Sequence, residues 1–182
     1  MLASVFRSAT RSALPRMAMA SSSSITPMYL RAAPRFVRFS SSNTLTKNSP
    51  VTQYASSDPV VKYTEEHEWI AVFPDNVAFI GITGYAADAL GDATYVETLA
   101  AGDSAEAGDS IGSVESVKSA SEIYAPVSCE ILEGNTDLSE KPNLINEDPT
   151  GKAWIAKVKI TEPEQLDELY TFEKYEEFLK SH

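Results

Sequence analysis

The sequence predicts a mostly β protein with short peripheral helices and one longer helix near its C-terminus. Most apolar residues fall in short runs that alternate with polar residues, which is the pattern of half-buried strands. Gly-Asp pairs begin at Gly91, Gly102 and Gly108, where they separate extended segments as turns. A longer helical pattern occurs only close to the C-terminus. These features indicate one antiparallel β domain whose strands reverse at short intervals.

The first 57 residues differ in composition from the rest of the chain. They contain every arginine, no Asp or Glu, and many Ser, Ala and Met residues. An Arg-rich and Ser-rich N-terminus without acidic residues is typical of an organellar transit peptide. The run RFSSS at residues 38–42 predicts cleavage near residue 40. The alternative is a disordered basic tail that binds anionic partners.

Residues 58–182 form the predicted domain, which is strongly acidic. This part has 26 acidic residues and eight lysines, a formal charge of −18. Such a surface excludes nucleic acid and favours cationic partner faces. No apolar run reaches the length of a membrane span. The single cysteine, Cys129, rules out an internal disulfide and a zinc cluster, and its position on an apolar strand face predicts a buried, inert thiol.

The first half of the domain reads as a β meander with a short helix set into it. We expect Thr83 to cap this helix, which spans residues 84–90, and Gly91 to end it. The expected strands flank the helix and a Pro-Asp-Asn turn, and they cover residues 69–73, 77–82 and 93–99.

Lys118 lies between two further strand patterns. Small residues surround it in the run ESVKSAS, and strict alternation of apolar residues follows over residues 123–131. The sequence therefore predicts that Lys118 stands at the tip of a β-hairpin, where another protein could reach its amine. The alternative is an ordinary solvated surface lysine.

The last part of the chain is expected to hold short helical turns, a strand and a helix. Two prolines in LSEKPNLINEDP break that stretch into short turns, and residues 154–160 alternate as a strand with one basic face. Thr161 and Glu164 predict a capping box that opens the C-terminal helix. Aromatic residues on that helix, Tyr170 and Tyr175 among them, are expected to belong to the core.

No set of residues for independent catalysis is visible. The only histidines are His67 and His182, and no metalloprotease, CxxC, nucleophile-elbow or phosphate-loop motif occurs. We therefore expect neither catalytic residues nor a metal site, and we expect His67 to have a conformational or core role beside Trp69. The sequence favours a non-catalytic carrier, in which an attached cofactor performs the chemistry.

Three stretches carry a family resemblance: HEW, ESVKSASEIYAPVSCEI and NEDP. In this order they resemble the H protein family of the glycine cleavage system, from about Tyr63 to Ile160. The resemblance implies a lipoyl-domain-like β-sandwich or barrel, a mitochondrial matrix location, and lipoate attached to Lys118 in amide linkage. Cys129 departs from the family, which most often has glycine there.

The resemblance also implies a working cycle and its partners. The lipoyl arm would carry the aminomethyl unit of glycine between a pyridoxal-phosphate-dependent glycine decarboxylase, a tetrahydrofolate-dependent aminomethyltransferase and a dihydrolipoamide dehydrogenase. Glu68 and Glu122 are our candidates for a groove that holds the loaded arm. Glu115 and Gly102 are candidates for recognition by the lipoate-attaching enzyme. We expect a monomer.

Three alternatives stay open at this point. The chain could be a lipoyl or biotinyl carrier domain of another multienzyme complex, although those families have DKA or MKM around the lysine and this chain has Val-Lys-Ser. It could be an enzyme, or an unlipoylated paralogue that acts as a scaffold. For Glu68, Glu122, Glu115 and Gly102 the alternative is an ordinary surface or turn role.

Overall fold

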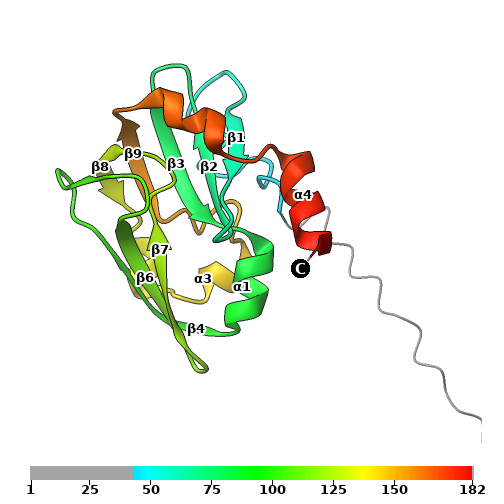
Figure 1. The fold of residues 1–182 in the computed structure, drawn as a ribbon. Coiled ribbons are helices and arrows are strands. Elements are labelled where there is room, and N and C mark those ends of the chain that lie inside the picture. Colours follow the sequence, from blue (N-terminus) through cyan, green and yellow to red (C-terminus); the bar gives the residue numbers. More distant parts are fainter. Residues whose placement is uncertain (1–42, 182) are drawn as a thin grey trace, which may run out of the picture. The chain divides into compact units, whose positions relative to one another are not determined.

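The computed structural model describes residues 43–181, and two antiparallel sheets form its framework (Figure 1). The six-stranded sheet has the order β1 (Val60–Tyr63), β2 (Glu68–Val72), β3 (Val77–Ile82), β9 (Ala156–Ile160), β8 (Cys129–Gly134), β5 (Ser104–Ala105). The three-stranded sheet has the order β4 (Ala93–Thr98), β6 (Ser110–Ser116), β7 (Ala120–Tyr124). The helices are α1 (Gly84–Leu90), α2 (Asp137–Glu140), α3 (Leu144–Glu147), the 3-10 helix η2 (Pro163–Glu168) and α4 (Phe172–Ser181). The predicted fold class is confirmed.

The main core lies between the two sheets and takes apolar side chains from both. Strand β3 is buried along its whole length, as its two apolar faces predict. Buried residues of the smaller sheet, such as Val114 and Ile123, join the same cluster as Ile80 and Val158 of the larger one. Burial of these side chains is the main force that holds the sheets together.

A second cluster is aromatic and packs α4 against β1, β2 and β3. It contains Tyr63, Trp69, Phe79 and Tyr175, all buried. The Trp69 indole N–H donates to the carbonyl of Ile82 at 2.8 Å. The core role predicted for the aromatic residues of the C-terminal helix is confirmed.

Helix α1 begins and ends as predicted. The Thr83 side chain accepts a hydrogen bond from the backbone N–H of Ala86, which is the N-cap interaction. At the other end Gly91 has φ 76° and ψ −160°, a conformation that is accessible to glycine and strained for other residues.

The single strand predicted over residues 123–131 is wrong, because the segment forms two strands in different sheets. β7 ends at Tyr124 and β8 begins at Cys129. The alternating apolar residues Ile123, Val127 and Ile131 are nevertheless all buried. Pro126 lies in the gap, and its missing N–H prevents it from donating to a strand ladder. The chain crosses from one sheet to the other here while its apolar side chains stay directed to the core.

The predicted capping box and continuous C-terminal helix are also wrong. The tail forms η2 and then α4, and the N-cap of η2 is Glu162, which makes no side-chain capping bond. Tyr170 separates the two helices because its backbone N–H and carbonyl both bond to Tyr63, at 2.9 and 3.0 Å. That bridge to strand β1 requires an extended residue where a helix would otherwise continue.

The folded domain includes residues 43–57, which precede the compositional boundary at residue 58. We call this segment the N-terminal strap. Asn43 and Val51 are buried. Tyr54 packs edge-on against Phe73 and Phe79, and its hydroxyl donates to Asp75. The expected cleavage point near residue 40 and His182 lie outside the described residues. Within residues 43–181, no helix is long and apolar enough to cross a membrane.

Candidate functional site

Lys118 stands at the tip of the hairpin formed by β6 and β7, as predicted (Figure 1). Ser116 closes the turn: its hydroxyl oxygen accepts the backbone N–H groups of Lys118 at 3.2 Å and Ser119 at 3.1 Å. The Ser116 N–H donates to the Ser119 carbonyl at 2.8 Å. Val117 at the tip is 79% exposed, and Lys118 is exposed as well. The turn therefore presents the lysine to solvent from a rigid base.

The Lys118 side chain passes over the end of helix α1. A Cβ atom at Gly91 would lie 3.2 Å from the lysine Nζ. Two bonds to Asn146 hold this turn: its side-chain amide donates to the Gly91 carbonyl at 2.7 Å and its Oδ1 accepts the Ala93 N–H at 2.9 Å. The Lys118 amine therefore lies so close to Gly91 that a side chain at position 91 would crowd it.

A cavity of about 230 Å³ lies between the lysine hairpin, α1 and the loop before β2. Its lining combines apolar side chains with carboxylates and serine hydroxyls. The lining residues are Glu66, His67, Glu68, Ile82, Ala86, Ala89, Leu90, Val114, Ser119, Ser121, Glu122 and Ile123.

Glu68 is buried, with 2% of its surface exposed, and it lines both this cavity and a neighbouring one that Thr64 and Tyr124 also line. It accepts hydrogen bonds from the Thr64 hydroxyl and from the Tyr124 backbone N–H. Burial raises the pKa of Glu68, and the nearby Glu66 charge raises it further, while the hydrogen bonds from Thr64 and Tyr124 oppose the shift. Burial therefore disfavours the charged form of Glu68, and a cation placed beside it would favour that form.

Glu122 borders the same cavity from the hairpin, but its carboxylate lies at the edge. Its cross-strand partner is Ser113, and its side chain accepts from the Ser110 hydroxyl. The neighbouring Ser121 and Ile123 pair with Val114 and Gly112 on the inward side of the sheet. The structure therefore brings Glu68, Glu122 and the lysine hairpin to the border of one cavity, where Glu68 is buried and Glu122 is exposed.

Glu115 and Gly102 do not meet in the structure. Glu115 is exposed on β6 and pairs with Tyr95, close to the lysine end of β4. Gly102 lies in the turn that follows the opposite end of β4, with φ 95° and no atom within 4 Å of its Cβ position. If both serve one partner, that partner must cover the length of this strand.

His67 is packed among aromatic rings, and its backbone has φ 75°. Its ring lies 4.5 Å from the Tyr85 ring and its Nδ1 is 2.9 Å from the Tyr175 hydroxyl. His67 is half-buried and its backbone conformation fits the conformational alternative of the prediction, but its ring contacts are with these tyrosines and not with Trp69. Cys129 is buried, and burial raises its pKa to about 11. Among residues 43–181, no group of three or more His, Cys, Asp or Glu side chains could hold a metal ion.

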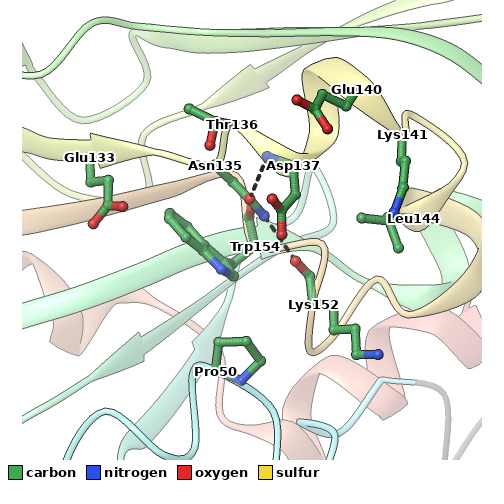
Figure 2. A pocket seen from close by; sticks show the side chains of 10 residues that line it. All are labelled: Pro50, Glu133, Asn135, Thr136, Asp137, Glu140, Lys141, Leu144, Lys152 and Trp154. Carbon is green, nitrogen blue, oxygen red and sulfur yellow. Dashed lines mark hydrogen bonds between the residues drawn. The ribbon is translucent and has the colours of Figure 1, made fainter.

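A larger cavity, of about 530 Å³, lies elsewhere and does not include the hairpin (Figure 2). Its centre is Asn135, whose side chain donates to the carbonyls of Lys152 and Trp154 and accepts from the Asp137 N–H. In Figure 2 the Lys152 side chain extends away from α2, while its backbone carbonyl faces the Asn135 amide. Because the Asn135 amide is already engaged with the backbone, it braces this loop.

An exposed lysine on a hairpin tip, beside a small cavity with an apolar wall and a buried carboxylate at its border, is the arrangement of a carrier protein. Comparison with known proteins gives the particular family. The model of the glycine cleavage H-protein family matches residues 61–182, and the chain belongs to this family. Its members are lipoyl carriers in glycine cleavage, and this is the role of the chain.

Individual relatives agree with the family assignment. The mitochondrial glycine cleavage system H protein of Saccharomyces cerevisiae is 51% identical over 148 residues, 79% of this chain and 87% of that protein. The H protein of Carboxydothermus hydrogenoformans is 50% identical over 120 residues, 66% and 92% of the two chains. A crystal structure of the Mycobacterium marinum H protein is similar in fold, with a TM-score of 0.59 and 37% identity over 65% of this chain and 95% of that one.

Sequence reasoning missed the apolar wall of the cavity and the contact of Lys118 with Gly91. The inward residues of β6 and β7, Val114 and Ile123, were visible in the alternation on both sides of the lysine. The contribution of α1 had no such signal, because the helix meets the hairpin only through the tertiary fold.

Proposed function

We propose that Lys118 carries lipoate in amide linkage and that the arm carries the aminomethyl unit of glycine among the enzymes of glycine cleavage. The observation that supports this most is the position of the Lys118 amine: exposed on a serine-closed turn, and adjacent to a cavity that contains a buried carboxylate. The chain itself supplies attachment, orientation and shielding, and it performs no catalysis.

The residues present fit a lipoyl group. Its hydrocarbon chain and dithiolane ring are apolar, and the cavity wall next to the hairpin is formed by Ala86, Leu90 and Ile123 among others. Acylation neutralises the lysine, so the arm can lie against this wall without burying a charge. When bound, lipoate supplies a disulfide that is reduced as it takes up the one-carbon unit and is reoxidised afterwards.

Glu68 would hold the positive charge of the loaded arm. As a buried anion it attracts an aminomethyl ammonium more strongly than a solvated carboxylate would. The apolar wall excludes water from the same place, which slows hydrolysis of the bound unit. Glu122 at the rim adds a second negative charge along the path by which the arm enters.

The partners proposed for this cycle are glycine decarboxylase, aminomethyltransferase and dihydrolipoamide dehydrogenase, with a lipoate-attaching enzyme acting first. Residues 58–182 have a formal charge of −18, so each of these enzymes is expected to dock through a cationic face. Glu115 and Gly102 are the proposed contacts of the attaching enzyme. The Arg-rich leader would direct the chain to the mitochondrial matrix and be removed near residue 40.

Intact-mass measurement and peptide mapping of the protein from its own organelle test this proposal. We expect one lipoyl group per chain, on the peptide that contains Lys118. It should be absent from a Lys118→Arg variant and present in a Lys174→Arg variant, which changes an exposed lysine on α4. A bare Lys118 in the native protein would contradict the carrier assignment and favour a scaffold role.

A further inference from the structure

We infer that Tyr175, on the C-terminal helix, is a positioning residue for the arm cavity. Its hydroxyl joins two elements that line the cavity, the His67–Glu68 turn and helix α1. Tyr175 is not among the lining residues, so it acts through others. The functional part of this inference rests on the proposed role of Lys118 and Glu68; the structural part does not.

The hydroxyl of Tyr175 has two partners. It lies 2.9 Å from Nδ1 of His67 and 3.0 Å from the hydroxyl oxygen of Thr83. A phenol has one hydrogen to donate and lone pairs with which to accept. It can therefore bond both partners at once, and the tautomer of His67 and the rotation of the Thr83 hydroxyl decide which group donates in each contact.

The Thr83 contact leads to helix α1 and then to the lysine. Thr83 caps α1 by accepting the Ala86 N–H at 3.3 Å. The same helix contributes Ala86 and Leu90 to the cavity wall and ends at Gly91, over which the Lys118 amine lies. Since α1 has only seven residues, it is marginal on its own and depends on contacts with the rest of the fold, this cap among them.

The His67 contact leads to the buried carboxylate. His67 directly precedes Glu68, and its φ of 75° is uncommon for a residue with a side chain. Such a conformation persists only where surrounding contacts impose it. The His67 carbonyl also accepts the Thr83 N–H at 2.9 Å, so the turn and the helix cap are joined directly as well as through Tyr175.

Tyr175 itself is held rigidly. It is fully buried, and its ring stacks on Tyr63 with a centroid distance of 4.8 Å and an interplanar angle of 10°. Burial raises the pKa values of both hydroxyls, so they stay protonated at neutral pH. The ring would keep its place without the hydroxyl, which allows the hydrogen bonds to be tested separately from the packing.

The test compares Tyr175→Phe with Tyr63→Phe in the full chain. Both substitutions remove one buried hydroxyl from the same ring stack, but the Tyr63 hydroxyl donates to the Asn43 carbonyl in the N-terminal strap. The first readout is amide hydrogen exchange of α1 in the unmodified chain. We expect exchange to be about tenfold faster in Tyr175→Phe and near native in Tyr63→Phe, as the loss of about one hydrogen bond to this helix would give.

The second readout is the rate at which the aminomethyl unit is hydrolysed from the lipoylated, loaded chain. Tyr175→Phe should shorten its lifetime several-fold, whereas Tyr63→Phe should not. Thr83→Ser keeps the hydroxyl and should behave as the native chain, and Thr83→Val should resemble Tyr175→Phe. Equal exchange and equal lifetimes in the two tyrosine variants would overturn the inference.

The two hypotheses fail differently. If the native chain is not lipoylated or does not protect its load, the proposed function fails, and α1 exchange alone decides whether Tyr175 orders the cavity. If the native chain protects its load and Tyr175→Phe does so equally well, the proposed function stands and the positioning role is refuted.

Discussion

The side chain of Glu68 accepts the backbone N–H of Tyr124 at 3.2 Å. Glu68 begins β2 of the larger sheet, and Tyr124 ends β7 of the smaller one, which carries Lys118. One carboxylate therefore lines the cavity and also fastens the base of the lysine hairpin to the rest of the domain. A change in its charge affects both the cavity and the link between the sheets.

Replacing Glu68 with glutamine should alter how stability depends on pH. Burial raises the pKa of this carboxyl in the folded chain above its unfolded value near 4.5. The folded state then binds the proton more tightly than the unfolded state, so Glu68 opposes folding increasingly as the pH rises through its folded pKa. Glu68→Gln should therefore lose less stability than the native chain between pH 5 and pH 7.

Urea unfolding at the two pH values measures this difference. Glu122→Gln, which removes an exposed carboxyl at the cavity rim, is the matched control and should follow the native chain. An equal change for native and Glu68→Gln chains would show that Glu68 does not titrate differently on folding.

Gly91→Ala should destabilise the domain and displace the lysine. The φ of 76° with ψ of −160° would strain an alanine by roughly 1–3 kcal/mol. Its Cβ would also lie 3.2 Å from the Lys118 Nζ, so the side chain must move. Gly108→Ala is the control, because Gly108 has φ 88° and no neighbour within 4 Å of its Cβ position. Both variants should lower the melting temperature, and only Gly91→Ala should change the rate of lipoate attachment.

Cys129 should be unreactive in the folded chain. Its side chain is 1% exposed, and burial raises its pKa to about 11. Because the thiolate is the reactive form, a thiol reagent at pH 8 should label the native chain only as fast as it unfolds. One equivalent should react at once in denaturant. Rapid labelling without denaturant would mean that the start of β8 opens locally.

Asn43→Ala should cost roughly 1–3 kcal/mol of stability, because it removes two hydrogen bonds that contribute about 0.5–1.5 kcal/mol each. The Asn43 side chain accepts the Tyr85 N–H and donates to Glu176, each at 3.2 Å, and so links α1 to α4. Gln53→Ala changes an exposed side chain in the same strap and should stay within about 0.5 kcal/mol of native. Chemical denaturation of the two variants gives both values.

The same contacts predict where the processed chain begins. Removal of Asn43 would expose partners on both helices, so N-terminal sequencing of the protein from its organelle should find a first residue at or before Asn43. A mature chain that begins near residue 58 would contradict a structural role for the strap.

Sequence patterns predicted those elements whose formation depends mainly on residues close together in the chain. Alternation and turn residues located the strands around Lys118, and capping chemistry located α1 between Thr83 and Gly91. The same alternation gave no warning that the chain changes sheets at Pro126, because the apolar side chains point inward on both sides of the crossing. The periodicity of apolar residues shows which face of a strand is buried, but it does not show to which sheet the strand belongs.

The parts of the site that sequence did not predict depend on contacts between distant residues. Tyr175 meets His67 across 108 residues and Thr83 across 92. The N-terminal strap was assigned with the leader because composition was the only signal there, and its small polar residues share the leader's composition. Glu68 was a candidate through the family resemblance, while its burial became visible only in the fold.

The exposed tip of the hairpin affects how readily the chain associates with copies of itself in solution. Val117 is a bare apolar side chain beside the lysine, and two such tips would gain by burying each other. Residues 58–182 of each chain carry a formal charge of −18, so like chains repel at long range. Ionic strength therefore decides whether the chains associate. In dilute buffer the repulsion keeps the hairpin tips apart. Concentrated salt screens the repulsion, so self-association should first be seen there.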